Sequence, residues 1–227
     1  MTATGATARP LRADAVRNRA RILEAAAEVF AERGLEVTLD DIAHHAGLGV
    51  GTVYRRFSDR ESLVEALFDE RMQVAKRRME AALDEPDAMQ ALEGVIRENC
   101  EQFAADRGLR QVMLTSTYGQ NSLAQCREEI PPIVERLVQR AKESGALRSD
   151  FQATDIPILF LMIGAVVDFT GAIEPGLWRR YLELFLDGIR VCRSSDGGAT
   201  APGSTHPALL HDQLMVAMGK CRPVSLR

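Results

Sequence analysis

The chain has 227 residues, of which 46% are hydrophobic and 26% are charged, and its formal net charge at pH 7 is -4. This composition excludes a disordered chain and is typical of a soluble globular protein with enough length for a sizeable core. The longest uncharged apolar stretch, residues 156–167, is too short to span a bilayer, and the start lacks the basic-then-apolar layout of a signal peptide. We therefore expect a cytoplasmic protein with no membrane partner.

The beginning of the chain is basic despite the acidic total. Residues 1–13 are rich in Ala, Thr and Arg without apolar periodicity, which predicts a flexible basic arm. Five arginines stand against the single Asp14 in the leading 21 residues, and Arg17 from this group is a candidate DNA contact. Because the local field governs encounter with phosphate more than the total charge does, the acidic total does not exclude nucleic-acid binding.

Residues 14–33 are predicted to form an amphipathic helix. Ile22, Ala26, Val29 and Phe30 recur at helical spacing, and Gly34 can take the left-handed conformation that ends a helix. We expect this helix to pack behind the elements that follow it.

Two short helices around a glycine turn are predicted between residues 38 and 57. Thr38 can cap the first, with Asp41 three residues on, and the glycines of 47–51 let the backbone reverse tightly. The second helix then presents small, hydroxyl-bearing and arginine side chains, which are Val50, Gly51, Thr52, Tyr54, Arg55 and Arg56. Small residues allow a close approach, hydroxyls bond phosphate, and arginines fork onto phosphate or guanine, so this face suits a DNA groove. An inward-packed Tyr54 ring and a merely solvated arginine pair are the alternatives.

The rest of the chain also predicts helices and no strand. A second capping box at Ser58-Asp59-Arg60-Glu61 opens a long helix to about residue 83, which links the two halves. Apolar spacing predicts further helices over 86–106, 109–117, 128–144, 154–170 and 174–189. Beyond residue 192 the Ser/Gly/Pro-rich composition predicts a linker, with one amphipathic helix at 208–218. The expected fold is all-α, with a helix-turn-helix domain at 14–60, a helical domain at 61–193 and a flexible tail at 194–227.

The motif is carried by Arg21-Ile22-Leu23, Ala46-Gly47-Leu48 and the continuous run Thr52-Val53-Tyr54-Arg55-Arg56-Phe57-Ser58-Asp59-Arg60-Glu61-Ser62-Leu63. With this spacing the chain resembles the N-terminal domain of the tetracycline-repressor (TetR) family of bacterial transcription regulators. Residues 145–150, 178–182 and 186–190 resemble the family's second half more loosely. One departure is Gly49-Val50-Gly51, which replaces the Ser-Lys-Gly type of sequence often seen and so lacks a common contact.

The resemblance implies a sequence-specific DNA-binding regulator, most simply a repressor, which a small-molecule effector releases from a near-palindromic double-stranded operator. It adds a phosphate contact from Thr38, and one from Arg60 at the position where the family usually places Lys. Members dimerise through their last two helices, and here these helices are apolar over more than one face, which suits an intersubunit four-helix packing in a homodimer. The expected interface residues are Ile163, Val167, Leu182, Phe185, Leu186 and Ile189.

A ligand cavity for a partly apolar effector is expected among the preceding helices. Its candidates are inward-facing residues that are apolar or singly polar, for which ordinary core packing is the alternative. They are Cys100, Phe103, Met113, Tyr118, Phe160, Gly164, Asp168 and Trp178. Asp168 stands within a mostly apolar helix and needs a partner, which a cationic inducer, Arg110 or solvent can supply.

Other function classes have less support from the sequence. No spacing of a nucleophile with a base, or of paired carboxylates, indicates an enzyme, and Gly47, Gly49 and Gly51 lack the strand and the Lys-Ser/Thr of a nucleotide loop, so no cofactor is expected. The four cysteines, Cys100, Cys126, Cys192 and Cys221, form no Cys-x-x-Cys pair, and the adjacent His44 and His45 point in different directions, so no metal site is expected. A redox- or metal-responsive regulator, and an activator of the same fold, stay open as alternatives.

Overall fold

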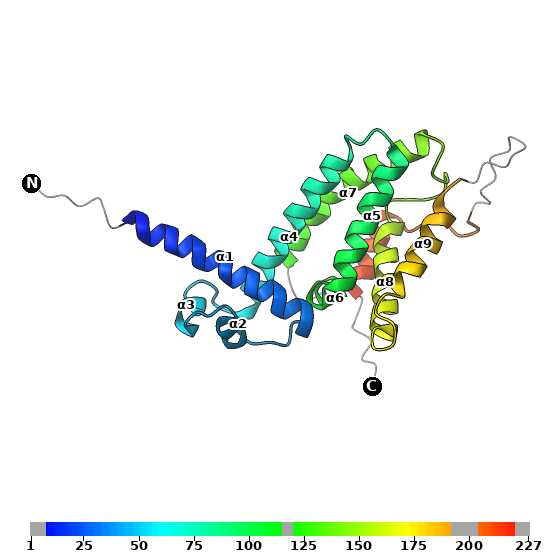
Figure 1. The fold of residues 1–227 in the computed structure, drawn as a ribbon. Helices are drawn as coiled ribbons and strands as arrows, with labels where there is room; N and C mark the ends of the chain where they lie inside the picture. Colours follow the sequence, from blue (N-terminus) through cyan, green and yellow to red (C-terminus); the bar gives the residue numbers. More distant parts are fainter. Residues whose placement is uncertain (1–7, 115–119, 192–203, 221–227) are drawn as a thin grey trace, which may run out of the picture.

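The computed structural model of the chain describes residues 8–114, 120–191 and 204–220, and across these ranges it is all-α, as predicted (Figure 1). The helices are α1 (Ala8–Arg33), α2 (Leu39–His45), α3 (Val50–Tyr54), α4 (Arg60–Ala82), α5 (Ala88–Ala105), α6 (Arg107–Leu114), α7 (Gln120–Glu143), α8 (Asp155–Thr170), α9 (Trp178–Ile189) and α10 (His211–Lys220). No described helix combines the length and the apolar character needed to cross a membrane. Instead of strands, the described ranges contain one isolated bridge between Leu147 and Arg190.

The first helix begins six residues earlier than expected. The predicted boundary at Asp14 followed the apolar stripe, but α1 starts at Ala8, so only residues 1–7 of the predicted arm lie outside the described residues. Ala, Leu and Arg are strong helix formers and need no apolar stripe, and Pro10 is tolerated within a first helical turn. An ion pair between Arg17 and Asp14, one turn apart, supports this extension.

The N-terminal hydrophobic core is larger than the domain predicted at 14–60. Its central side chains, Ile22, Phe30, Ile42 and Val53, come from α1, α2 and α3 and are almost completely buried. The same core also takes side chains from the first half of α4 and from α6, namely Leu63, Val64, Leu67, Phe68 and Val112. The boundary at residue 60 therefore cuts through packed side chains, because α4 buries its first turns in one core and its later turns in the other.

The second core is built around α5, which contacts α4, α7, α8 and α9 (Figure 1). Leu92, Ile96 and Cys100 of α5 are fully buried and pack in one cluster with Leu137 of α7 and Leu186 of α9. The second core is therefore formed by a central helix, α5, and the four helices that pack around it.

Two helices of the second half differ in length from the predicted spans. α7 begins at Gln120 instead of residue 128, and Pro131 and Pro132 therefore lie within the helix and not in its first turn. α9 begins at Trp178 instead of residue 174. Its end is held by a two-pronged ion pair in which the Arg190 guanidinium bonds Glu93 of α5 at 2.6 Å through both Nε and Nη2.

The last described helix, α10, lies inside the tail that was predicted to be flexible. Its existence confirms the amphipathic pattern at 208–218, and Leu214 on its inner face is buried. The segment before it is tied to the body of the protein, since the Ser204 N–H donates to Asp150 Oδ2 at 2.5 Å. The Arg148 guanidinium on the same carboxylate holds the pKa of Asp150 well below its usual range. Residues 204–220 of the predicted tail are thus ordered by specific contacts.

The short helix α6 joins the two cores. Gly108 packs so closely on α1 that a Cβ there would lie 2.9 Å from the Cβ of Phe30. Gln111 Oε1 accepts a hydrogen bond from the Leu35 N–H at 2.7 Å, and Val112 is buried in the N-terminal core. On its other side, Arg110 pairs with Asp168 of α8. A displacement of α6 therefore acts directly on the helix that supports α2 and α3.

Candidate nucleic-acid interface

The turn between α2 and α3 is built as the sequence predicted. Thr38 Oγ1 accepts from the Asp41 N–H at 3.2 Å, and the Asp41 carboxylate accepts from the Thr38 N–H at 2.9 Å, which completes a capping box. These hydrogen bonds, chiefly the one from the Thr38 backbone, lower the pKa of Asp41. Gly47 ends α2 with φ +61°, a left-handed conformation that side chains other than glycine rarely adopt.

One face of α3 is presented to solvent while the opposite face is buried. Val53 is completely buried, whereas Val50 is 42% exposed and Tyr54 is 49% exposed, so the Tyr54 ring does not pack inward. A Cβ on Gly51 would meet no atom within 4 Å. The exposed Arg55 reaches along the same surface, where its Nη2 lies 3.2 Å from Thr52 Oγ1. The arrangement leaves a small, open centre at Gly51 that is flanked by hydroxyl and guanidinium donors, which is a surface suited to close approach by a polyanion.

Two of the arginines proposed as DNA contacts, Arg56 and Arg60, also hold the domain together. Arg56 Nη2 donates to the Ala15 carbonyl of α1 at 2.9 Å, and Arg60 Nη1 donates to the Leu35 carbonyl at 2.7 Å. Arg17 is exposed and pairs with Asp14. The candidate contacts from α3 and those from Arg17 and Arg56 therefore lie on connected elements, because the Arg56 hydrogen bond fixes α1 beside the end of α3.

Sequence reasoning missed two arginines that position the turn. Arg21 Nη2 donates to the Ala46 carbonyl at 2.7 Å, which ties α1 to the end of α2. The Arg19 guanidinium lies 6.0 Å from the centre of the Phe57 ring. Both contacts join residues far apart in the chain, and apolar periodicity carries no signal for a charged side chain that anchors a distant carbonyl.

Five of the eight predicted effector residues come together in the structure. Cys100, Phe103, Phe160, Gly164 and Asp168 come together where α5 meets α8, with the Phe103 and Phe160 rings stacked at 5.9 Å. A Cβ on Gly164 would lie 2.8 Å from Phe103, so only glycine allows this close contact. These five candidates therefore form one cluster next to α6.

Met113 and Trp178 are the residues that the structure places outside this cluster. Met113 is partly buried against the N-terminal core, because α6 turns that side of the chain toward α1, and its assignment to a ligand cavity stays a prediction. Trp178 is buried at the start of α9, with the Arg179 guanidinium 4.5 Å from its ring centre. Tyr118 lies outside the described residues.

Asp168 has the arginine partner that was one of its three expected alternatives. Its carboxylate is 51% exposed at the side chain and lies 3.2 Å from Arg110 Nη2. Solvent therefore also reaches Asp168, and the structure does not require a cationic ligand to neutralise it.

Cys100 is the cysteine whose side chain the structure describes, out of the four that left a redox response open. Its thiol is fully buried, and burial raises its pKa to about 12. A thiol that stays protonated at neutral pH is a poor nucleophile. Among the described residues, no three His, Cys, Asp or Glu side chains form a group that could hold a metal ion.

We expect Cys100 to resist alkylation in the folded protein. Native protein treated with iodoacetamide at mildly alkaline pH should show no modification of the peptide that contains Cys100, while protein unfolded in guanidinium chloride should be modified there completely. The measurement is peptide mass spectrometry of both samples. Rapid modification of Cys100 in the native sample would show that the thiol is accessible and would reopen the redox alternative.

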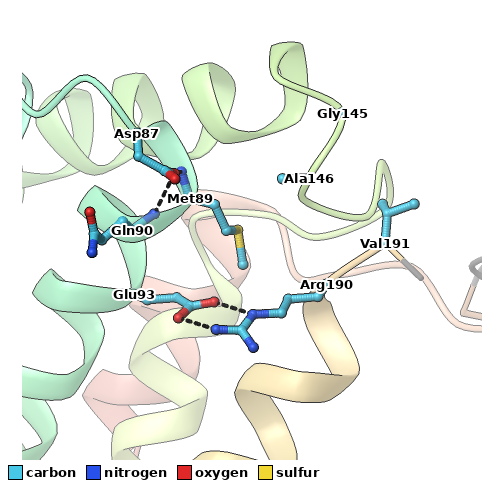
Figure 2. Close-up of a pocket in the computed structure, with 8 residues that line it drawn as sticks. All are labelled: Asp87, Met89, Gln90, Glu93, Gly145, Ala146, Arg190 and Val191. Carbon is cyan, nitrogen blue, oxygen red and sulfur yellow. Dashed lines mark hydrogen bonds and ion pairs between the residues drawn. The ribbon is translucent and has the colours of Figure 1, made fainter. Parts of the chain in front are cut away.

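A cavity of about 570 Å³ lies at the end of the second core farthest from α3, as Figure 2 shows in close-up. Its lining residues are Asp87, Met89, Gln90, Glu93, Gly145, Ala146, Arg190 and Val191. Glu93 and Arg190 form an ion pair among these lining residues, as the dashed lines in Figure 2 show, so the two charges neutralise each other. None of the predicted effector residues lines this cavity.

Four of the six residues predicted for the dimer interface are buried within a single copy of the chain. Ile163, Leu182, Leu186 and Ile189 pack in the second core of one copy, and their assignment to a dimer interface stays a prediction. Val167 and Phe185 are partly buried against the same core. Helices that are apolar on several faces do not reveal by spacing which face lies inside.

The exposed apolar residues of α8 and α9 form two parallel stripes instead. We define the outer stripes as the exposed residues at helical spacing on these two helices, which are Met162, Ala165 and Phe169 on α8 and Tyr181, Leu184 and Gly188 on α9. Phe169 is 82% exposed, which is exceptional for a large aromatic side chain. Large exposed apolar side chains gathered on neighbouring helices are typical of a protein-protein contact.

Comparisons with known proteins agree with this geometry. Residues 22–67 match the model described as bacterial regulatory proteins, tetR family, and residues 87–191 match the model of the C-terminal domain of SbtR-like transcriptional regulators. The HTH-type transcriptional repressor BepR of Brucella suis is 28% identical over 86% of this chain and 98% of its own length.

Two crystal structures give the same result. A TetR transcription regulatory protein from Mycobacterium vanbaalenii is 31% identical, with a TM-score of 0.59 over 80% of this chain and 100% of that one. The TetR transcriptional regulator SCO0520 from Streptomyces coelicolor is 30% identical, with a TM-score of 0.57 over 76% and 98% of the two chains. The similarity therefore extends over both cores and exceeds the helix-turn-helix alone.

Proposed function

The chain belongs to the TetR family of bacterial regulatory proteins, and from this we propose that it is a transcriptional repressor which binds a near-palindromic DNA operator as a homodimer and leaves it when a small molecule binds the second core. Membership of this family makes the chain a DNA-binding regulator and excludes an enzyme. The operator, the dimer and the effector are the parts that the proposal adds.

The exposed face of α3 is the observation that carries the DNA-binding part. Val50, Gly51, Tyr54 and Arg55 share this face, and its centre is open because Gly51 has no side chain. A helix in the major groove needs small residues where its backbone approaches the bases, and hydroxyl or guanidinium donors at the edges. We propose that Thr38 at the N-terminus of α2, Arg17 on α1 and Arg56, which is hydrogen-bonded to α1, contact phosphates on either side.

The outer stripes support a homodimer. A second copy that packs its own α8 and α9 on the same stripes would bury Met162, Phe169, Tyr181 and Leu184 in a four-helix arrangement. Two copies of α3 would then enter successive major grooves, roughly 34 Å apart or a multiple of that distance. The operator would carry the twofold symmetry of the protein.

Release by an effector follows from the position of α6. A ligand that favours a different arrangement of the cluster at Phe103, Phe160 and Gly164 acts on α6 through Arg110, and α6 is packed into the N-terminal core. The ligand can shift the equilibrium only by its difference in affinity between the two arrangements.

Selection of bound sequences from random duplex DNA, at a fixed and stated salt concentration, tests this proposal. We expect enrichment of a near-palindromic consensus whose half-sites are separated by about one helical turn or a multiple of it. The control is the same selection with a protein that carries Gly51→Glu. Absence of any consensus with the wild-type protein, or an equal consensus with the control, would contradict the proposal.

A further inference from the structure

Arg110 differs from the other buried charged residues in the described part of the chain. These residues are Glu93, Asp106 and Arg110, and the first two are neutralised by close ion pairs with Arg190 and Arg71. Arg110 is only 7% exposed, yet its ion-pair partner is the half-exposed Asp168. A buried guanidinium with a weak counter-charge is costly and needs a reason.

The hydrogen bonds of Arg110 are also incomplete. Nη1 donates to the carbonyls of Phe103 at 2.9 Å and Ala104 at 2.7 Å, and Nη2 lies 3.2 Å from Asp168 Oδ1. Nε is buried and has no hydrogen-bond partner among the described residues. Arginine recognises carboxylates best through two parallel N–H donors, and here one such donor is unused while another is held by a carboxylate that solvent can reach.

Apolar groups pack close to the Arg110 side chain. A Cβ on Gly164 would lie 3.4 Å from Arg110 Cδ and 2.8 Å from Phe103, and the Phe103 ring stacks on that of Phe160 at 5.9 Å. Cys100 lies one helical turn from Phe103 and is buried as an uncharged thiol. One buried cation at the edge of an aromatic and aliphatic cluster matches a ligand with one negative group and an apolar body.

We propose that the effector is an organic acid whose carboxylate binds Arg110 in place of Asp168, while its apolar part lies against Phe103 and Phe160. This inference rests on the proposed function, because it names the chemical class of the effector of that same cluster. A carboxylate on Nε and Nη2 satisfies the unused donor and frees Asp168 to enter solvent. Phe160 is only partly buried, so solvent reaches this edge of the cluster.

The same exchange explains how the signal reaches α3. Arg110 is followed directly by Gln111, whose Oε1 accepts a hydrogen bond from the Leu35 N–H, and then by Val112, which is buried in the N-terminal core. A guanidinium drawn toward a ligand moves this turn of α6 against α1. Release of Asp168 at the same time loosens α6 from α8.

Titration calorimetry on the full chain without DNA tests the charge of the ligand. The probes are phenylacetate, phenylbutyrate and octanoate, each compared with its primary amide and with the amine of the same carbon skeleton. We expect the best carboxylate to bind roughly tenfold or more tightly than its amide, since a hydrogen bond to a charged group contributes about 1.5–3 kcal/mol, and we expect the amines not to bind. Carboxylates that bind no better than their amides, or do not bind, would overturn the proposal.

Two variants separate Arg110 from Asp168 in the same titration. Asp168→Asn should tighten the carboxylate roughly two- to fivefold, because it removes a competing ion pair of the exposed kind, whereas the matched control Asp187→Asn should change nothing. Arg110→Gln should weaken it at least about tenfold. Since Arg110→Gln removes buried hydrogen bonds, Asp168→Asn is the decisive variant, and weaker carboxylate binding in it would overturn the proposal.

The readout keeps this inference separate from the proposed function. Calorimetry needs no operator, so carboxylate binding is measured whether or not the protein binds DNA. If the wild-type protein selects a palindromic operator but binds no carboxylate better than its amide, the effector class is wrong and the repressor proposal stands. If carboxylates bind as expected but no operator is selected, the effector class stands and the repressor proposal is wrong.

Discussion

Replacement of Gly51 by Glu is expected to abolish specific operator binding while the folded protein stays as stable as the wild type. Gly51 lies at the centre of the exposed face of α3, and a new Cβ there meets no atom within 4 Å. Glu is a better helix former than Gly, so the free energy of unfolding should change by less than about 1 kcal/mol. On DNA, however, the side chain would keep the helix from the bases and place a carboxylate beside phosphates. We expect operator affinity to fall at least about a hundredfold in a fluorescence anisotropy titration.

Gly94→Glu is the matched control for this prediction. Gly94 lies on the exposed side of α5, and a Cβ there also meets nothing within 4 Å. The same change in charge and side-chain size, placed away from α3, should leave operator affinity within about twofold, an effect near the limit for surface substitutions. Unchanged affinity in Gly51→Glu, or an equal loss in both variants, would show that α3 does not approach the DNA.

Leu184→Arg is expected to convert the dimer to a monomer and to weaken operator binding at least about a hundredfold. Leu184 is the central large residue of the outer stripe on α9 and is 55% exposed in the isolated chain. Opposed arginines across a twofold axis would repel each other inside an apolar contact. Because two linked half-site contacts gain about 10²–10⁴ in affinity over one, loss of the dimer should remove most of the operator affinity. Analytical ultracentrifugation gives the oligomeric state, and anisotropy gives the affinity.

Val216→Arg provides the comparison for Leu184→Arg. Val216 is also 55% exposed and apolar, but it lies on α10, outside the outer stripes. This variant should remain dimeric with unchanged operator affinity. A monomer produced by Val216→Arg, together with a dimer retained by Leu184→Arg, would place the interface on α10 instead.

The DNA-binding half was accessible from the sequence because its signals are local. Thr38 and Asp41 are three residues apart, and their capping box depends on no other part of the chain. Gly47 needs its left-handed backbone for the same local reason. In contrast, Arg21 and Arg56 anchor carbonyls that are 25 and 41 residues away, so no pattern in the sequence predicts those roles.

The helices of the second half were predicted from the sequence, but the side that each helix buries was not. α8 is apolar almost all round, so spacing alone did not distinguish Ile163, which is buried, from its neighbour Met162, which is exposed. The contact of Met113 with the N-terminal core was not predicted for a related reason, since α6 has one side in each core. The pairing of Asp168 with Arg110 was among the alternatives, but the missing partner of Nε depends on three-dimensional packing.

The position of α6 between the cores has a consequence for the construction of hybrid regulators from this chain. Consider a chimera in which the chain is exchanged after α4. It would remove Val112 from the N-terminal core and would remove the hydrogen bond that Gln111 accepts from the Leu35 N–H. Gly108 would be lost as well, and a larger residue from another sensor would collide with Phe30. A functional chimera must therefore transplant the α1-facing side of α6 together with the first four helices. One side of α6 belongs to the proposed DNA-binding part and the other side to the proposed effector-binding part. No single crossover point in the gene therefore separates the two parts.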